Sequence, residues 1–494
     1  MISFNKEKTE HIKDKSGNKQ ILQLTYFFAA LFIALIVYVS IFVYKDSDEV
    51  INNSYNKRES LYSAKTVRGE ILSRDGEVLA FTDTSNGSEV RVYPYGKLFA
   101  HVVGYNIKGK AGVESLANFR LLKSNEYVFD RIKNSVAGIK NPGDSIVTTL
   151  DLKTQYAAYN ALGDRNGAVV VMDAVNGYIL AMVSKPDFDP NELIYTWDYM
   201  TNDPNNSSLL NRCTSGLYPP GSTFKILTAL EYLKENSSAN NTEINDYDFD
   251  CTGSFEYKGT KINCYHGISH GEIDFDTSFA KSCNSSFANI TTTLNKDSFR
   301  RTCESMLFNN EIPSPAIINK RSSMNVKNSF VPINSNSSVD ELIQTGIGQG
   351  KTEVTPYHLC LISAAIANEG ILMNPIIVKE IETSSGDHIV STSVRQYKRL
   401  LSLEDSDKVK SLMREVITDG TGTNLLNTNG YTAFGKTGSA EFSTNKSESH
   451  ALFTGFAEGD NGGKIAICVI IENGGSGGQV AVPVAKAVFD AYYN

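Results

Sequence analysis

The sequence Tyr-Pro-Pro-Gly-Ser-Thr-Phe-Lys (218–225), followed by Ile-Leu-Thr-Ala-Leu-Glu-Tyr-Leu-Lys (226–234), joins a chain-breaking turn to a segment that favours helix. The pattern predicts that Ser222 lies at a helix N-terminus, with Lys225 one turn later on the same face. There the Lys225 amine can reach the Ser222 hydroxyl, and free N–H groups at the helix end can hold an oxyanion. We therefore predict that Ser222 is a nucleophile and that Lys225 is its base, provided that burial or a neighbouring cation lowers the lysine pKa.

A serine followed by a lysine three residues later is weak evidence by itself, because the chain repeats that spacing at Ser16, Ser54, Ser278 and Ser443. Two further elements follow Ser222 in order, Ser282-Cys283-Asn284 and Lys436-Thr437-Gly438-Ser439. We expect Ser282 to relay protons between Lys225 and a leaving amine, and Asn284 to offer its amide to a substrate carbonyl. The segment 436–439 is predicted to be an edge strand that binds an extended peptide, with Lys436 and Thr437 directed at a terminal carboxylate and Gly438 allowing close backbone approach.

The N-terminal region contains a candidate membrane span. No charged residue lies between Lys19 and Lys45, and the apolar run is long enough to cross about 30 Å of hydrocarbon. The rival interpretations, a cleaved signal peptide and a buried core helix, fit its length and its flanks less well. Lysines precede the run and acidic residues follow it, which favours a cytoplasmic N-terminus. We therefore expect a cytoplasmic tail (1–19), a retained single-pass transmembrane helix (20–44) and a catalytic domain outside the cell membrane.

The composition limits the class of protein to which the chain can belong. With 494 residues, 41% hydrophobic and 21% charged, it is typical of a globular protein. A net charge of −8 gives no general reason to bind nucleic acid, and we expect no such partner. Short alternating runs predict a small α+β pedestal over 45–149. A hairpin at 168–183, a strand at 463–471 and a helix at 482–493 predict one α/β domain, 150–494, whose sheet is assembled from both ends.

The three motifs that begin at Ser222, Ser282 and Lys436, and their order along the chain, resemble those of the class B penicillin-binding proteins. The segment Arg68-Gly-Glu-Ile-Leu-Ser-Arg-Asp-Gly is similar to the Arg-Gly-x-Ile-x-Asp-Arg-Asn-Gly segment of that family's pedestal. Ser73 and Asp75 depart from it, which puts the contacts of those two side chains in question. The segments 112–114, 346–356 and 436–441 also match the family pattern, so the resemblance covers about residues 60–494.

The resemblance implies the penicillin-binding transpeptidase fold, an antiparallel sheet flanked by helices plus an all-helical lobe. It implies a membrane-anchored D,D-transpeptidase that cross-links peptidoglycan stem peptides through a Ser222 acyl-enzyme, with an oxyanion hole formed by the backbone N–H groups of Ser222 and Ser439. β-Lactams would acylate the same serine, and a SEDS-type glycosyltransferase would be the membrane partner. The alternatives are a D,D-carboxypeptidase, a class D-like β-lactamase or β-lactam sensor, and a non-enzymatic scaffold that activates its polymerase.

The reaction requires no cofactor, but a cysteine and histidine cluster precedes and overlaps the second element. Cys251, Cys264, His270 and Cys283 carry the thiolate and imidazole groups that bind zinc, and a structural zinc there would brace the active-site wall. The rival interpretations are a Cys251–Cys264 disulfide and buried free thiols, because the spacing lacks paired Cys-x-x-Cys knuckles. The other four cysteines are predicted to be core thiols.

Overall fold

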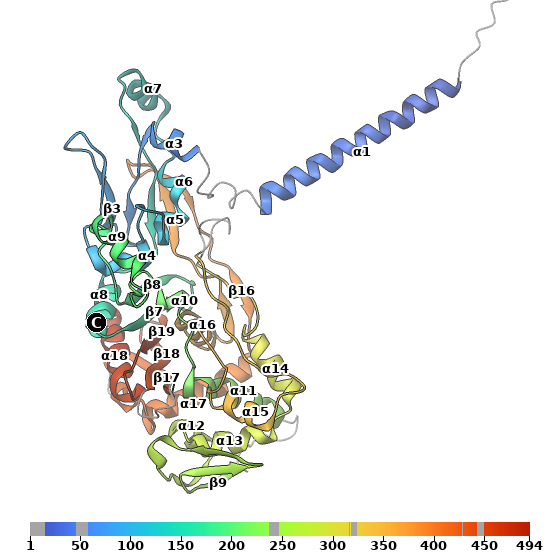
Figure 1. The fold of residues 1–494 in the computed structure, drawn as a ribbon, viewed down its shortest axis with the longest axis vertical. Helices are drawn as coiled ribbons and strands as arrows, with labels where there is room; N and C mark the ends of the chain where they lie inside the picture. The colour runs from blue at the N-terminus through green and yellow to red at the C-terminus, as the bar shows by residue number, and fades with distance from the viewer. Residues whose placement is uncertain are drawn as a thin grey trace, which may run out of the picture. The chain divides into compact units, whose positions relative to one another are not determined.

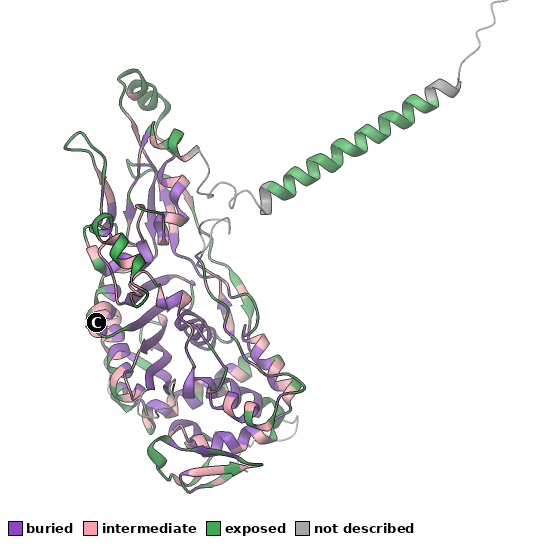
Figure 2. Cartoon of the chain, viewed as in Figure 1, coloured by how far each residue is buried: buried purple, intermediate pink, exposed green. Residues whose placement is uncertain are grey.

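The computed structural model describes residues 15–45, 58–236, 247–315, 317, 324–426, 428–441 and 449–494. It divides into two compact units, Met1–Arg58 and Glu59–Asn494. The first contains helix α1 (Lys15–Lys45). Its segment Lys19–Phe42 has a mean hydropathy of 2.4 and is exposed throughout, and within the described residues it alone is long and apolar enough to cross a membrane (Figure 2). This agrees with the predicted span, whereas most of the predicted tail, residues 1–14, lies outside the described residues.

The centre of the second unit is a five-stranded antiparallel sheet of order β17-β18-β19-β7-β8 (Figure 1). Its strands are β17 (Tyr431–Glu441), β18 (Ser449–Gly459), β19 (Lys464–Ile471), β7 (Gly167–Asp173) and β8 (Ile179–Lys185). The predicted assembly from both ends is confirmed, because β19 pairs with β7 and places Ile465 opposite Asp173. β17 has a strand partner on one side only, so it is an edge strand.

Helices cover the sheet and supply most of its packing. α8 (Leu152–Leu162) and α18 (Val482–Tyr493) pack together, and α8 begins where Asp151 accepts a 2.7 Å hydrogen bond from the Thr154 N–H. Every residue of α16 (Pro356–Ala367) is buried, and the helix packs against β7, β18 and β19. This apolar sequence therefore forms a core helix, which fits its short length.

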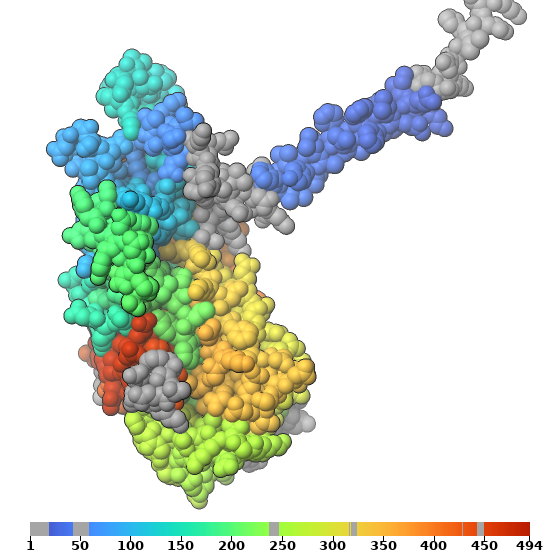
Figure 3. Space-filling model, viewed as in Figure 1, coloured from blue at the N-terminus to red at the C-terminus, as the bar shows by residue number. Residues whose placement is uncertain are grey.

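A predominantly helical lobe lies between β8 and β17 in sequence. Its helices are α11 (Lys225–Asn236), α12 (Phe275–Ala280), α13 (Asn284–Thr293), α14 (Lys296–Ser305), α15 (Val339–Gly346) and α17 (Leu403–Thr418). Two helices that also follow β8 lie elsewhere: α9 (Leu193–Asn202) packs beside α4 (Ala100–Val103), and α10 (Arg212–Ser215) packs against β7, β8 and α16. The lobe is not purely helical, because it carries two small antiparallel sheets. They are β9 (Asp248–Cys251) with β12 (Gly271–Asp274), and β10 (Ser254–Tyr257) with β11 (Thr260–Asn263). These hairpins and α12 form one end of the unit (Figures 1 and 3).

The pedestal contains a six-stranded mixed sheet of order β15-β14-β6-β2-β3-β4. Four strands come from the predicted pedestal: β2 (Ile71–Leu72), β3 (Val78–Asp83), β4 (Val90–Val92) and β6 (Ser145–Thr148). The other two, β14 (Val378–Glu382) and β15 (His388–Ser391), come from far beyond residue 149. The predicted domain boundary stays a prediction, but hydrogen-bonded strand pairing crosses it in space.

Short elements complete the described residues of this unit. They are α3 (Arg58–Ser63), α4 (Ala100–Val103), α5 (Gly112–Leu116), α6 (Asn118–Leu121), α7 (Val128–Val136), β1 (Thr66–Val67), β5 (Asn141–Pro142), β13 (Ile371–Met373) and β16 (Gln396–Arg399), together with several 3₁₀ turns. The structure shows what the side chain of Ser73 does, at the position where the family segment has Asp. The buried Ser73 hydroxyl accepts hydrogen bonds from the N–H groups of Asp75 (3.2 Å) and Glu77 (3.0 Å), which closes the turn before β3.

A buried charge cluster holds the pedestal together. Glu114 is fully buried and accepts hydrogen bonds from Arg68 Nε (2.7 Å) and Arg91 Nε (2.7 Å), while the hydroxyl of Tyr93 lies 3.2 Å away. Burial by itself raises the pKa of Glu114, but the Arg68 and Arg91 guanidiniums outweigh it and hold this pKa below its usual value. The carboxylate thus stays charged and joins the start of the pedestal to β4 and α5.

We expect Glu114→Gln to lower the free energy of unfolding by about 3–5 kcal/mol, because it leaves two buried guanidiniums without their counter-ion. Glu89→Gln is the matched control in the same pedestal, since Glu89 pairs with Lys140 at the surface and should cost under about 1 kcal/mol. Denaturant titration of both variants measures the difference. Equal, small effects would contradict a stabilising role for the buried cluster.

Candidate active site

Ser222 lies in the 3₁₀ turn Gly221–Phe224, and α11 begins directly after it at Lys225. The predicted helix is therefore present, but it starts three residues later than Ser222. The turn is anchored on both sides of the serine: the Thr223 hydroxyl donates to the Pro220 carbonyl (2.7 Å), and the Phe224 ring packs in the core against Phe308. Ser222 itself is half-buried, so its hydroxyl is held on a rigid turn while remaining accessible.

Three glycines bring other backbone segments against this turn. The Gly221 N–H donates to the Gly348 carbonyl at 2.8 Å, and a Cβ at Gly348 would lie 2.0 Å from the Gly221 carbonyl oxygen. Gly348 also has φ +75°, which disfavours any side chain. On the opposite side, a Cβ at Gly221 would meet the Ser439 carbonyl at 2.9 Å, and one at Gly438 would lie 3.1 Å from the Pro220 carbonyl. Gly438 thus lies close to the backbone of the serine turn, while its predicted role in binding a substrate peptide stays a prediction.

The three predicted elements converge on one hydroxyl. Lys225 Nζ donates to the Ser282 carbonyl (2.7 Å) and to Asn284 Oδ1 (2.8 Å), and it lies 3.4 Å from Ser282 Oγ. Lys436 Nζ donates to the same Ser282 Oγ at 2.8 Å. Within the described part of the chain, the Lys225 amine makes its hydrogen bonds to Ser282 and Asn284 rather than to Ser222. Ser282 thus connects two lysines that are far apart in sequence.

Both lysines are fully buried, and their burial changes their acid–base behaviour. Burial lowers the pKa of Lys225 to about 8. Burial, together with the nearby Lys225 charge, holds the pKa of Lys436 well below its usual value. Each amine also faces an aromatic ring, Phe287 for Lys225 and Phe279 for Lys436, with a nitrogen-to-centroid distance of 5.3 Å in both cases. Burial therefore favours the neutral form of both amines, and a neutral amine can accept a proton.

Ser282 adopts a backbone conformation that is unusual for a residue with a side chain, with φ +60°. Its position is fixed from the following residue, because Cys283 is the N-cap of α13 and its sulfur accepts from the Ser286 N–H at 3.3 Å. The Asn284 side chain is fixed in turn by a 3.1 Å hydrogen bond from Nδ2 to the Asn263 carbonyl. Ser282 and the Asn284 amide are therefore held by neighbouring protein groups.

The third element differs in part from expectation. The Lys436 side chain is fully buried and directed at Ser282, which leaves Thr437 as the member of this pair nearer to the surface. The Thr437 hydroxyl is hydrogen-bonded to that of Thr421, a residue that the sequence reasoning missed. The run Gly420-Thr-Gly422 before a predicted strand was an available signal, but only the fold shows that Thr421 faces the site. Ser439 lies on the edge strand β17, half-buried.

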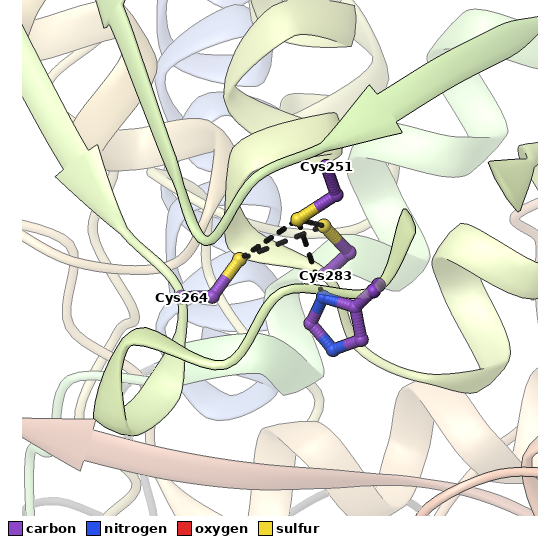
Figure 4. A group of neighbouring side chains, drawn as sticks. Cys251, Cys264 and Cys283 are labelled. Carbon is purple, nitrogen blue, oxygen red and sulfur yellow. Dashed lines mark hydrogen bonds between the residues drawn. The ribbon is translucent and has the colours of Figure 1, made fainter. Parts of the chain in front are cut away.

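The four predicted metal ligands also come together. Their ligand atoms in Cys251, Cys264, His270 and Cys283 all lie within 4.8 Å of one another, directly behind the Ser282–Asn284 segment (Figure 4). The remaining cysteines, Cys213, Cys303, Cys360 and Cys468, are buried thiols of the main core, as predicted.

Comparison with known proteins agrees with this geometry. Residues 167–490 match the penicillin binding protein transpeptidase domain, and residues 68–146 match the penicillin binding protein A dimerisation domain. A sheet flanked by helices with a serine, two lysines and an asparagine at its edge defines a serine acyltransferase of the penicillin-recognising type. The chain belongs to the class B penicillin-binding proteins.

Individual relatives span nearly the whole chain. The peptidoglycan D,D-transpeptidase PbpA of Mycolicibacterium smegmatis is 30% identical, with 88% of this chain and 91% of the relative covered. The corresponding Mycobacterium tuberculosis protein is 28% identical, with 96% and 99% covered. The ceftriaxone acyl-enzyme complex of M. tuberculosis penicillin-binding protein A superposes with a TM-score of 0.77 at 27% identity, covering 88% of this chain and 100% of that one.

We expect Gly348→Ala to slow acylation by a penicillin about a hundredfold, because its Cβ would displace the Gly221 carbonyl and shift the nucleophile by a fraction of an ångström or more. Gly462→Ala is the matched control: it has φ +85° as well, but no atom lies within 4 Å of its Cβ position. Stopped-flow or gel-based acylation rates compare the two. Equal rates in both variants would show that the close contact does not position the serine.

Proposed function

We propose that Ser222 is the nucleophile of a peptidoglycan D,D-transpeptidase reaction and that Lys225 is its general base. One observation carries this assignment. A half-buried serine lies on a fixed turn, and three residues later in the sequence comes a buried lysine whose pKa is lowered to about 8. Hydroxyl attack requires removal of a proton near neutral pH, and a desolvated lysine can accept it. The D,D-transpeptidases among the relatives support the same reaction.

The steps follow from the arrangement of these groups. Ser222 Oγ attacks the carbonyl of the D-Ala–D-Ala bond while Lys225 takes its proton. The bond from carbon to the serine oxygen forms, and the peptide C–N bond breaks. The departing D-Ala amine receives a proton through the Ser282 hydroxyl, which lies between the two lysines. A neutral amine of a second stem peptide then attacks the ester carbonyl. The C–N bond of the cross-link forms, the ester C–O bond breaks, and a proton from the amine passes by way of Lys225 to Ser222 Oγ.

Substrate binding is assigned to the exposed edge of β17. An extended stem peptide can add to this edge through main-chain hydrogen bonds. The paired hydroxyls of Thr437 and Thr421 are suited to the terminal carboxylate, with Lys436 supplying positive charge from behind when it is protonated. Asn284 would contact a peptide carbonyl, and the N–H groups of Ser222 and Ser439 would form the oxyanion hole.

The membrane placement and the partner are part of the proposal. The lysines before the α1 span favour a cytoplasmic N-terminus and an extracytoplasmic catalytic domain. A SEDS-type glycosyltransferase is proposed as the polymerase that supplies glycan strands. In support, the pedestal presents exposed apolar side chains that could contact a membrane partner, on and beside α3 and α7: Leu61, Tyr62, Tyr127, Val128, Phe129, Ile132, Val136 and Ile139.

Intact-mass analysis of the full-length protein with benzylpenicillin should show one covalent adduct, and peptide mapping should place it on Ser222. Ser222→Ala should remove the adduct completely, because the substitution deletes the hydroxyl that is proposed to attack the β-lactam carbonyl. Ser443→Ala, which alters another serine with a lysine three residues later, is the control and should be labelled normally. An adduct that persists in Ser222→Ala would refute the assignment.

Product analysis separates the enzymatic alternatives. With a stem-peptide donor and an amine acceptor, a transpeptidase yields cross-linked dimers, a D,D-carboxypeptidase yields the shortened peptide, and a β-lactamase releases hydrolysed penicillin rapidly. If Ser222→Ala supported both polymer synthesis and cross-linking, the scaffold interpretation would replace the enzymatic one.

The acylation rate should depend on pH with the sign set by Lys225. The neutral amine is the active form, so the rate should fall about tenfold per unit as pH drops below about 8 and level off above it. Lys225→Arg should lose acylation at every pH, because a guanidinium stays charged. Lys234→Arg, an exposed lysine of the same helix, should keep the native profile. A flat profile from pH 6 to 9 would exclude Lys225 as the base.

A further inference from the structure

Helix α7 of the pedestal carries an apolar stripe that its own domain does not cover. Every residue of this helix is exposed except Asn134, which is half-buried (Figure 2). The stripe is formed by four side chains that are 54–86% exposed, Val128, Phe129, Ile132 and Val136. Apolar side chains at this spacing normally face a core. Here they face outward.

The four side chains of the stripe lie on one face of α7. At 3.6 residues per turn they fall within about 100° of arc, and Asn134 lies on about the opposite side of the helix. The contacts agree with this geometry, because Asn134 Nδ2 donates to Asn141 Oδ1 of β5 at 3.1 Å. The helix therefore packs on the pedestal through its polar side and presents its apolar side to the exterior.

Hydrogen bonds on either side of α7 hold it in this orientation. Before the helix, the Asn125 N–H donates to Asp144 Oδ1 at 2.8 Å. After the helix, the Asn141 N–H donates to the Lys65 carbonyl at 3.0 Å. The outward direction of the stripe is thus set by the pedestal itself, and an external surface is needed to cover it.

Charged side chains border the stripe in the pattern of a helix that lies at a membrane interface. Lys133 lies about 40° beyond Phe129, at one edge of the stripe. Arg131 lies about 60° beyond Val128, at the other edge, and Asp130 is on the far side of the helix. Both basic residues are exposed. Basic side chains in such positions bind anionic headgroups while the apolar stripe enters the acyl boundary.

The surrounding segment differs in charge from the chain as a whole. Residues 120–140 contain five basic and two acidic residues, whereas the full chain has a net charge of −8. Tyr127, which directly precedes α7, is 66% exposed, and tyrosine is enriched at membrane–water interfaces. An acidic protein therefore presents a basic and apolar surface at this end of its pedestal.

The chain reaches this end of the pedestal directly from the apolar span. Twelve residues, 46–57, separate α1 from α3, and an extended chain spans at most about 3.6 Å per residue. After α3 the chain enters β1, which pairs with β5 shortly after α7. Within the Glu59–Asn494 unit, α7 and the hairpins of β9–β12 lie at opposite ends (Figure 1). The end that carries α7 is thus the one tethered to a bilayer that α1 crosses.

We propose that the apolar stripe of α7 docks on a lipid surface containing anionic phospholipids, in the membrane that α1 crosses. The stripe enters the boundary between headgroups and acyl chains, and Arg131 and Lys133 contact lipid phosphates on its two sides. One short amphipathic helix binds lipid weakly, but the covalent link to α1 keeps the effective concentration of lipid high. Docking of this kind rests on the membrane span and is independent of the acyl-transfer reaction.

Tryptophan fluorescence of the full chain tests this docking. The protein has one tryptophan, Trp197, which gives the same background in every variant. Phe129→Trp, reconstituted in vesicles of equal parts phosphatidylcholine and phosphatidylglycerol, should add the emission of a shielded indole. Lipids brominated near the glycerol end of the acyl chain should quench about half or more of that added emission. Tyr195→Trp is the matched control, because Tyr195 is 86% exposed on α9 and should give a water-exposed, unquenched indole.

The contribution of charge is measured in the Phe129→Trp background. Arg131→Gln and Lys133→Gln should each lower the ratio of docked to undocked protein about fivefold, since each removes one cation from the lipid surface. Vesicles of phosphatidylcholine alone and added salt should act in the same direction. Lys261→Gln removes an exposed lysine at the hairpin end and should leave the ratio unchanged.

Replacing Ile132 and Val136 together by serine should abolish quenching by brominated lipid, and the unfolding midpoint should stay native because both side chains are exposed. A water-exposed, unquenched tryptophan at position 129 in anionic vesicles would overturn the proposal. So would a shielded tryptophan that brominated lipid does not quench, since a second copy or a protein partner would then cover the stripe. Equal quenching in neutral and anionic vesicles would refute the role of Arg131 and Lys133.

Discussion

The hydrogen bonds that two buried lysines make to Ser282 are the interaction on which the rest of this structure depends. Removing Lys225 and Lys436 from water lowers the pKa of both amines and so favours their neutral, proton-accepting form. Burial of this kind is unfavourable unless every partner is held in place. The glycine contacts at the nucleophile turn, the aromatic rings under the amines and the edge strand β17 supply that support from separate parts of the chain. The catalytic arrangement is therefore a property of the assembled domain.

The Ser282–Asn284 segment is held in place differently from the serine turn. There Ser282 has a positive φ of +60°, and Cys251, Cys264, Cys283 and Ile273 form a small buried cluster separate from the main core. The Asn284 side chain is held there by its hydrogen bond to the Asn263 carbonyl, so a short strand end fixes part of the candidate site.

The pedestal is joined to the catalytic domain by backbone pairing as well as by packing. Strands β14 and β15 extend a sheet that begins near the N-terminus, and the buried Glu114 holds two arginines from that same region. Residues 378–391 therefore belong to the pedestal sheet in space although they follow the start of the catalytic domain in sequence.

Local sequence patterns alone determined much of this protein. The bounds of α8, its Asp151 cap, the hairpin of β7 and β8, the final helix and the apolar span follow from propensity, periodicity and turn chemistry within a few neighbouring residues. The identities of Ser222, Lys225, Ser282 and Lys436 as one group also followed from sequence, through their order and resemblance. Tertiary structure decided the rest: that Lys436 points inward at Ser282, that Thr421 joins Thr437, that β14 and β15 pair with the pedestal and that four distant ligands meet. These contacts join residues far apart in sequence, and their geometry depends on packing that no local pattern specifies.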